Sequence, residues 1–465
     1  MDDIVIRQTS IKESFMFSIL FLFLIVLGVW SQWPTTITPD AAMHAEIVEL
    51  IGQQGYVTTW QPYADNAYTY PPLFHYLAFL LPLESIDAVR ALGIVLWLVL
   101  PVVMYLLVST FNKKAGMIAA FLVVLVPSFS NVFIYSEFPQ LLAMILLLLE
   151  WFLLRTERVS WAACTVGVIG LTHVFFVLIA ALLFLVHTKV RDWKYGMLAL
   201  LVMVPWLPAY VRVVMNVLFG QWENVRYNAT QPVFGFWGTK ELYDWFVGVH
   251  GLTAVLVILS VYGFFVTKDR ILRGIFVFSV FFTVFHVPFT QLKILDLLAF
   301  PVVMLASLAI TSLPLKTFWK KSVVVIVVVF MLIVQVNHFY VAKKWWLNPE
   351  IAPTEEFADA ARWLGEYDDS VVRVYFHQAS AWGGILAHKL PLEPDITHLE
   401  AFSESYRKQI EGQREIKDAL ADRKEIDIAI VKKYDVKYLV VPVELESQLD
   451  LLYENGVWGV YTNLQ

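Results

Sequence analysis

The sequence has little charge, a single cysteine and no repeated or low-complexity segment. Only 16% of its 465 residues are charged and 58% are hydrophobic, a balance that soluble domains of this size do not show. The lone cysteine, Cys164, excludes an internal disulfide framework and a thiolate metal site. The net charge of −6 is modest and gives no sign of nucleic-acid binding. These absences point to a polytopic membrane protein.

Long apolar runs predict the membrane-spanning helices. Residues 15–33 suffice to cross a hydrocarbon core about 30 Å thick, and no small-residue cleavage site follows them, so we interpret them as a retained first helix. Further apolar blocks lie at 86–108, 115–134, 139–154, 159–171, 174–187, 195–214, 243–266, 271–289, 294–313 and 321–340. If the two short blocks on either side of His173 are separate passes, the chain has about eleven spans.

Basic residues set the predicted orientation, because Lys and Arg accumulate in cytoplasmic loops. They gather in alternate loops, near residues 7–12, 113–114, 155–158, 189–194, 268–273 and 316–321. This pattern places the N-terminus in the cytoplasm and the loop after the first span outside. Residues 1–340 would form the transmembrane domain, with a long first outer loop over residues 34–85.

The composition changes after residue 340, where charge rises and helix and strand patterns alternate. Strands are expected at 371–376 and 437–443, and helices at 355–367, 403–423 and 426–434. We therefore predict an α-helical polytopic membrane protein, in the plasma membrane, whose residues 341–465 form a small extracytoplasmic α/β domain.

Ionisable residues at the outer mouth of this apolar chain are the candidates for chemistry. Asp40 and His44 stand at i, i+4 and would share one helical face, and Pro39 suits the first turn of that helix. Asp40 could cap the helix, or accept a proton from an acceptor hydroxyl. Glu137, in the second outer loop, is either solvated or binds a cation or substrate. Asp40, Glu137 and His44 could together hold Mg²⁺ or Mn²⁺.

Two basic residues on the outer side run against the charge bias. Lys293 lies at the outer end of a span and has either Asp296, three residues on, or a lipid phosphate as its partner. Arg90 begins a span on the same side, and its partner could likewise be an acid of the protein or a lipid phosphate. His75 lies in the apolar stretch 73–83, which is too short to span and is predicted to lie flat at the membrane interface.

These features, in this order, resemble the GT-C superfamily of polyprenyl-phosphate-dependent glycosyltransferases, which includes protein O-mannosyltransferases, aminoarabinose transferases and oligosaccharyltransferase catalytic subunits. Asp40–His44 is similar to an Asp-x-x-Tyr-His stretch of the oligosaccharyltransferases, and Tyr70–Tyr76 resembles the His-Pro-Pro-Leu-Tyr-Tyr stretch of the other branches. Glu137 falls where the family has its second-loop acid. The Trp-Trp-Asp-Tyr-Gly signature is absent, which argues against sequon-directed N-glycosylation.

The resemblance implies transfer of a sugar, with inversion, from a lipid-linked donor to a glycan, lipid or protein acceptor at the outer membrane surface. A divalent cation is optional in the family. The implied site consists of Asp40, Glu137 and His44 as catalytic or cation-binding residues, Lys293 and Arg90 at the donor phosphate, and Tyr70 and His75 at the substrate.

Two other functions are compatible with the sequence. A catalytically inactive relative that binds lipid-linked glycan or scaffolds a complex could keep the same residues. A membrane transporter is the third hypothesis. Transporters often show internal repeats and polar groups in mid-span, whereas this sequence shows no repeat and its ionisable residues cluster at the outer mouth.

Overall fold

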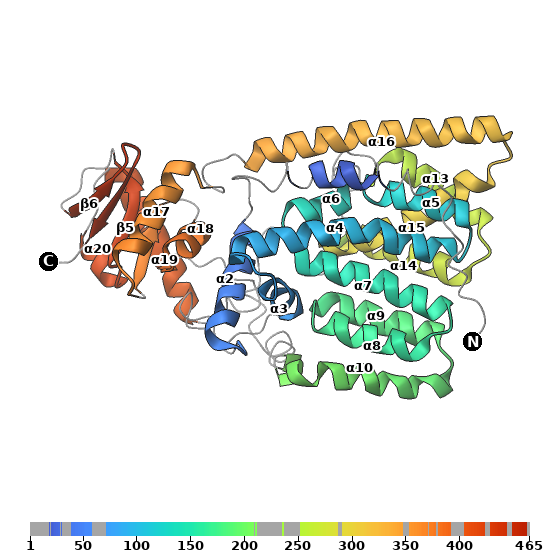
Figure 1. Ribbon diagram of the computed structural model, residues 1–465, viewed down its shortest axis with the longest axis horizontal. Coiled ribbons are helices and arrows are strands. Elements are labelled where there is room, and N and C mark those ends of the chain that lie inside the picture. The colour runs from blue at the N-terminus through green and yellow to red at the C-terminus, as the bar shows by residue number, and fades with distance from the viewer. Residues whose placement is uncertain are drawn as a thin grey trace.

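The computed structural model describes residues 18–29 except 19 and 28, 39–57, 71–211 except 209, 235–236, 252–286, 291–346, 353–370, 372–377, 380–391, 404–423, 428–443 and 449–462. Figure 1 shows a bundle of helices and, at the other end of the molecule, a smaller domain that contains the C-terminal sheet. Helices α2 (Pro39–Gln54) and α3 (Leu73–Phe79) lie between these two parts.

The helices of the bundle follow the predicted apolar blocks. They are α4 (Ser85–Ser109), α5 (Lys113–Val123), α6 (Pro127–Ile134), α7 (Phe138–Arg155), α8 (Val159–Gly170), α9 (Val174–His187), α10 (Gly196–Met203), α13 (Ala254–Val266), α14 (Arg270–Val284), α15 (Gln291–Ser312) and α16 (Thr317–Trp346). Short 3-10 turns η1 (Val190–Tyr195) and η2 (Val204–Trp206) flank α10, and strands β1 (Gly235–Phe236) and β2 (Phe285–His286) pair antiparallel. Side-chain caps define several starts: Asn112 accepts from two backbone N–H groups of α5, and Asp269 accepts from one in α14.

Fewer helices than expected are long enough to cross a membrane. Within the described ranges three qualify by length and composition, namely α4, α7 and residues Phe318–Val341 of α16. The pair α5 and α6, bent by 50°, gives a fourth if both belong to one span. The prediction of about eleven spans is therefore wrong for this part of the chain. The reason is that α8, α9, α13 and the apolar part of α15 have 10–17 residues, whereas a span needs about 20.

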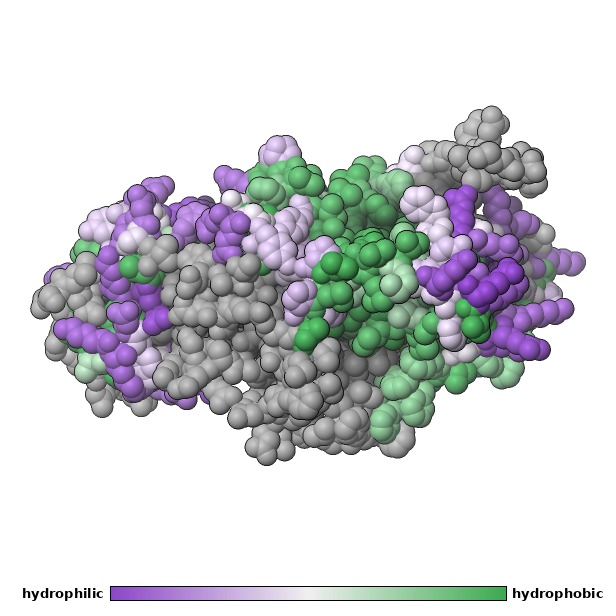
Figure 2. Space-filling model, turned by 90° about the horizontal axis from the view of Figure 1, so that it is seen from below, coloured by the Kyte–Doolittle hydropathy of each residue, from purple (hydrophilic) through white to green (hydrophobic). Residues whose placement is uncertain are grey.

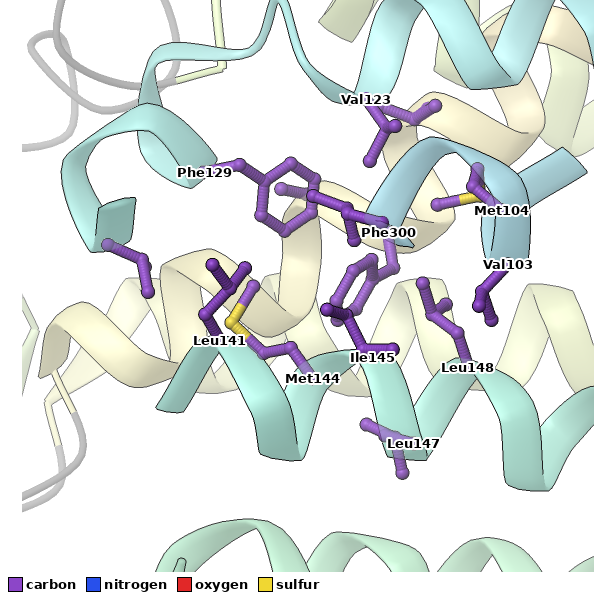
Figure 3. Packing of buried hydrophobic residues seen from close by; sticks show 14 of the residues in the cluster. Val103, Met104, Val123, Phe129, Leu141, Met144, Ile145, Leu147, Leu148 and Phe300 are labelled. Atoms are coloured by element: carbon purple, nitrogen blue, oxygen red, sulfur yellow. The ribbon is translucent and has the colours of Figure 1, made fainter. Parts of the chain in front are cut away.

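The bundle core is filled by apolar side chains from α4 to α7 and from α15 (Figure 3). Phe129 of α6 and Phe300 of α15 meet with their ring centroids 4.7 Å apart. Glycines allow the closest helix crossings. A Cβ atom on Gly93 in α4 would lie 2.5 Å from the ring of Phe138 in α7, so α4 and α7 depend on a glycine for their separation at this point.

The surface also indicates a membrane protein. On the face seen in Figure 2, hydrophobic residues form a band across the middle of the molecule, with hydrophilic residues on both sides of it. Large apolar side chains are exposed on α14 and α16, among them Phe281 and Ile333. Apolar surface of this extent, together with the long apolar helices, is typical of contact with lipid.

The C-terminal domain is built on a five-stranded sheet with the order β4-β3-β5-β7-β6. Its elements are α17 (Glu355–Tyr367), β3 (Arg373–Phe376), α18 (Ser380–Ala387), β4 (Leu390–Pro391), α19 (Glu404–Arg423), α20 (Ile428–Lys433), β5 (Tyr438–Pro442), β6 (Asp450–Glu454) and β7 (Trp458–Thr462). Strand β3 runs parallel to β4 and β5, and β7 runs antiparallel to β5 and β6. The helix predicted at 355–367 is confirmed, and the two predicted strands contain β3 and β5.

Helix α2 belongs to both parts of the molecule. Three alanines on it, Ala41, Ala42 and Ala45, are buried in the apolar core of the C-terminal domain. Met43 packs in another cluster with Trp206, and α2 also contacts α3 and α4. Because alanine has a small side chain, α18 of the C-terminal domain can approach α2 closely. The two parts are therefore joined through the helix that carries Asp40.

Candidate active site

The first predicted acid lies at the start of α2. This helix begins at Pro39, as the sequence predicted, and Asp40 is in its first turn with a partly buried side chain. The backbone N–H groups that end a helix at its N-terminus favour a negative charge there. A negative charge on Asp40 is therefore favoured at this position, one helical turn before His44.

His44 is buried and both of its ring nitrogens are engaged. The side chain is 1% exposed, and its Nδ1 atom lies 3.0 Å from Nε2 of His75 on α3, which is fully buried. His44 is also hydrogen-bonded to the backbone of Ser136. Burial lowers the pKa of His44 to about 3, although the bond to Ser136 opposes this shift. Burial, and then the neighbouring His44, lower the pKa of His75 well below its usual value, so both rings are neutral at pH 7.

The second predicted acid follows a turn with an unusual backbone. The N–H of Glu137 donates to the carbonyl of Val132 at 3.0 Å, and the N–H of Ser136 donates to that of Phe133 at 3.2 Å. These two bonds form a Schellman motif at the end of α6, in which Ser136 takes the left-handed position with φ of 60°. Glycine is usual there, because a left-handed L-residue costs about 1–2 kcal/mol. The motif sets the partly buried Glu137 at the entrance to α7.

The histidines bring the two acidic segments together. His44 contacts Ser136, the residue before Glu137, and stands one turn after Asp40. A row of aromatic rings supports this contact, because Phe74 lies 5.7 Å from the His44 ring and 5.9 Å from the Phe138 ring. The structure therefore places the start of α2 beside the turn between α6 and α7, at the end of the bundle that faces the C-terminal domain (Figure 1).

The predicted phosphate-binding residues are only partly described. Arg90, 7% exposed, forms an ion pair with Asp87 of the same helix at 3.1 Å. Lys293 lies in the first turn of α15, and its side chain falls outside the described residues. Asp296, one turn later, accepts hydrogen bonds from the hydroxyl of Ser128 at 2.6 Å and from the side-chain amide of Gln140 in α7 at 2.7 Å. Asp296 thereby fixes the start of α15 to α6 and α7.

Tyr70 also lies outside the described residues, and nothing is added to its predicted role. His75, the other predicted substrate contact, is turned to His44. Sequence reasoning missed the side chains of Ser128 and Gln140 and the backbone of Ser136. Ser128 and Gln140 are polar residues inside the predicted apolar blocks 115–134 and 139–154, and this is the signal that could have identified them.

The predicted cation set does not form. A histidine ligand needs a ring nitrogen with a free lone pair, and both nitrogens of His44 are already hydrogen-bonded, to His75 and to Ser136. In the part of the chain that the structure describes, no group of three or more His, Cys, Asp or Glu side chains is placed to hold a metal ion. Asp40 and Glu137 alone would be a sparse ligand set.

Comparison with known proteins identifies the fold. No protein-family model and no curated protein sequence matches the chain. Its fold is similar to that of ArnT from Cupriavidus metallidurans bound to undecaprenyl phosphate, with a TM-score of 0.62 and 13% identity over 97% of this chain and 98% of ArnT. It is also similar to the oligosaccharyltransferase AglB from Archaeoglobus fulgidus in complex with an inhibitory peptide and dolichol-phosphate, with a TM-score of 0.54 and 12% identity over 94% and 70%.

A third similar structure is the mycobacterial arabinofuranosyltransferase AftD, with a TM-score of 0.55 and 13% identity. The match includes 96% of this chain and 41% of AftD. All three are glycosyltransferases of the GT-C superfamily. The predicted resemblance to that superfamily is therefore confirmed for the fold.

Proposed function

We propose that this protein is a membrane glycosyltransferase that moves a sugar from a dolichyl- or undecaprenyl-phosphate-linked donor to a glycan, lipid or protein acceptor. The observation that carries the proposal is the contact between α2 and the turn before α7, because it joins the segments of Asp40 and Glu137 at one end of the bundle. Neighbours with the same fold bind undecaprenyl phosphate and dolichol-phosphate. We place this end of the bundle on the extracytoplasmic side, with the N-terminus in the cytoplasm.

The proposed reaction is a displacement at the anomeric carbon of the sugar. A lone pair of the acceptor forms the new bond to that carbon, and the bond to the phosphate oxygen breaks with its electron pair, which leaves polyprenyl phosphate. Asp40 takes the proton of the acceptor or orients it, and Glu137 positions the donor sugar. Attack opposite the leaving phosphate inverts the anomeric configuration.

The membrane location follows from the donor. A long isoprenoid chain stays in the bilayer, so its phosphate can meet protein groups only near the membrane surface. Lys293 and Arg90 are the proposed contacts for that phosphate, since cationic side chains near the headgroup level attract phosphates. The pair of Arg90 with Asp87 keeps the guanidinium charged and oriented at the start of α4.

The test compares Asp40→Asn and Glu137→Gln with the native protein, reconstituted in lipid with a panel of undecaprenyl- and dolichyl-phosphate-linked sugars. Release of polyprenyl phosphate is followed by mass spectrometry. Loss of a proton-transfer group lowers turnover by about 10²–10⁴-fold, and we expect this from Asp40→Asn. The matched control is Glu84→Gln, because Glu84 is an exposed acid just before α4 whose side chain makes no capping bond. Undiminished release by both site variants would remove Asp40 and Glu137 from the mechanism. No release by the native protein with any of the donors would favour the scaffold or transporter hypotheses instead.

A further inference from the structure

The buried pair of His44 and His75 is not explained by the proposed chemistry. Sequence reasoning placed one among the catalytic residues and the other at the substrate, yet the two rings face each other in the interior. Their centroids are 5.0 Å apart with 52° between the planes, and the Nδ1–Nε2 distance of 3.0 Å is that of a hydrogen bond. A group that touches substrate needs a path to it, and these side chains are 1% and 0% exposed.

The direction of the hydrogen bonds can be worked out from the partners. The bond between His44 and the backbone of Ser136 favours the protonated ring, so the backbone group is the carbonyl, which can only accept. His44 therefore donates from Nε2 and must accept at Nδ1. His75 then donates from Nε2 to His44. Two hydrogen bonds therefore connect three segments of the chain. His75 of α3 donates to His44 of α2, and His44 donates to the carbonyl of Ser136 in the turn that ends α6. We call these two bonds the histidine relay.

We propose that His44 and His75 are positioning residues, which hold the strained turn at Ser136 against α2 and so fix Glu137 relative to Asp40. The relay reaches the carbonyl of the residue that directly precedes Glu137. That residue is in the left-handed backbone region, where a serine is unfavourable without support from its neighbours. The ring of Phe74 packs against both His44 and Phe138, and so supports the contact between α2 and this turn.

This inference deepens the proposed function and rests on it for its kinetic consequence. Because both histidines are buried, we assign neither of them to the reacting atoms. If the hydrogen bonds of the histidine relay are broken, Glu137 moves relative to Asp40, while Lys293 and Arg90, the proposed contacts for the lipid phosphate of the donor, remain in place. A misplacement of about 1 Å can reduce turnover by as much as 10²-fold. The loss should therefore appear in kcat, with little change in KM for the donor.

The matched variants are His75→Gln and His75→Leu. A glutamine amide nitrogen can occupy nearly the place of Nε2 and still donate to His44, whereas leucine fills the space without a donor. We expect kcat within about threefold of native for His75→Gln, and a decrease of about 10–100-fold for His75→Leu. If His75→Leu does not fold, His75→Asn replaces it, because the shorter amide stays polar but cannot reach His44.

Kinetics alone depend on the proposed activity, so the position of the turn is measured separately. Spin labels at Gln53 on α2 and Tyr135 beside Ser136, both exposed, would be introduced in a Cys164→Ala background. The inference predicts one narrow distance distribution for native protein and His75→Gln, and a broadened or shifted one for His75→Leu. This result stands even if no donor is turned over, in which case only the proposed function fails.

Two outcomes would overturn the inference. One is an unchanged distance distribution and unchanged kcat in His75→Leu, which would make the pair ordinary core packing. The other is a rise in KM with kcat preserved in both His75 variants, which would make His75 a substrate contact.

Discussion

Ser136 holds a backbone conformation that glycine adopts more easily, and it is fully buried. Its hydroxyl has no hydrogen-bond partner among the described residues, so the side chain contributes little there. What the site uses is its backbone: the carbonyl accepts from His44, and the N–H closes the Schellman motif. The serine can therefore be changed without loss of these bonds.

Replacement of Ser136 by glycine should stabilise the protein and leave its activity intact. Glycine removes the left-handed strain, and after allowance for its larger entropy in the unfolded chain we expect a gain of about 0.5–1 kcal/mol in the free energy of unfolding. The reverse change, Gly55→Ser, serves as the control, because Gly55 has φ of 72° and open space around it. It should lose a similar amount. Thermal unfolding in detergent measures both, and a destabilised Ser136→Gly would contradict the strain argument.

Single residues of the site were predictable only where the pattern was local. Asp40 and His44 were found from their i, i+4 spacing, and Asp87 as the partner of Arg90 is an i, i+3 contact. The pairing of His44 with His75 spans 31 positions and two motifs, and no local periodicity predicts it. The left-handed Ser136 was also hidden, because serine is not the residue that signals such a turn.

At the scale of elements, the crossing of α4 and α7 depends on Gly93. The ring of Phe138, directly after Glu137, fills the space that a side chain on Gly93 would need. Phe138 itself is fully buried and is packed against Phe133 and Phe74, so it has little room to move. The helix crossing and the position of Glu137 are therefore coupled.

The change Gly93→Ala should destabilise the protein. Overpacking of this kind costs about 1–3 kcal/mol, and the better helix propensity of alanine returns about 1 kcal/mol, so the expected net loss is at most about 2 kcal/mol. Gly274→Ala in α14 is the control, since a Cβ there meets nothing within 4 Å. It should be neutral or stabilising in the same thermal unfolding measurement. Equal behaviour of the two variants would show that α4 and α7 separate without strain.

Elements were predicted better than their arrangement. Apolar blocks gave the helices of the bundle, because a hydrophobic run of ten or more residues favours a helix whether or not it spans. They did not give the number of spans, which depends on where each run is broken. In the C-terminal domain, α17 was predicted from its amphipathic pattern, whereas β6 and β7 were missed. The pair Asn455-Gly456 between those strands is a hairpin signal that would have identified them.

At the scale of the whole molecule, the C-terminal domain and the bundle meet at α2, and Glu49 of that helix links them. Its carboxylate accepts a hydrogen bond from Ser85 at the start of α4, at 3.1 Å. It also pairs with His388 of the C-terminal domain, at 3.4 Å. The alanine face of α2 supplies the apolar part of the same interface. Any change in this pair therefore acts on the helix that carries Asp40.

The stability of this interface should depend on pH through His388. The hydrogen bond to Glu49 raises the pKa of His388 above its usual 6.5, and the charge of Glu49 adds to the shift, against the opposing effects of burial and Lys389. A raised histidine pKa means that the folded state holds its proton more tightly than the unfolded chain does. The stabilisation is thus complete below pH 6.5 and is lost as the pH rises through the raised pKa.

We therefore expect the unfolding temperature of the native protein to fall from about pH 6 to about pH 8.5, by more than in the variant His388→Gln, whose side chain does not titrate. Glu49→Gln should flatten the curve in the same way, because it removes the carboxylate that raises the pKa. The two single variants and their double variant form a double-mutant cycle, which gives the interaction free energy between Glu49 and His388. An interaction free energy that is present at about pH 6 and absent at about pH 8.5 assigns the effect to this pair. If the unfolding temperatures of the native protein and His388→Gln change with pH in parallel, the interface between the bundle and the C-terminal domain is stabilised by the alanine face of α2 and not by this pair.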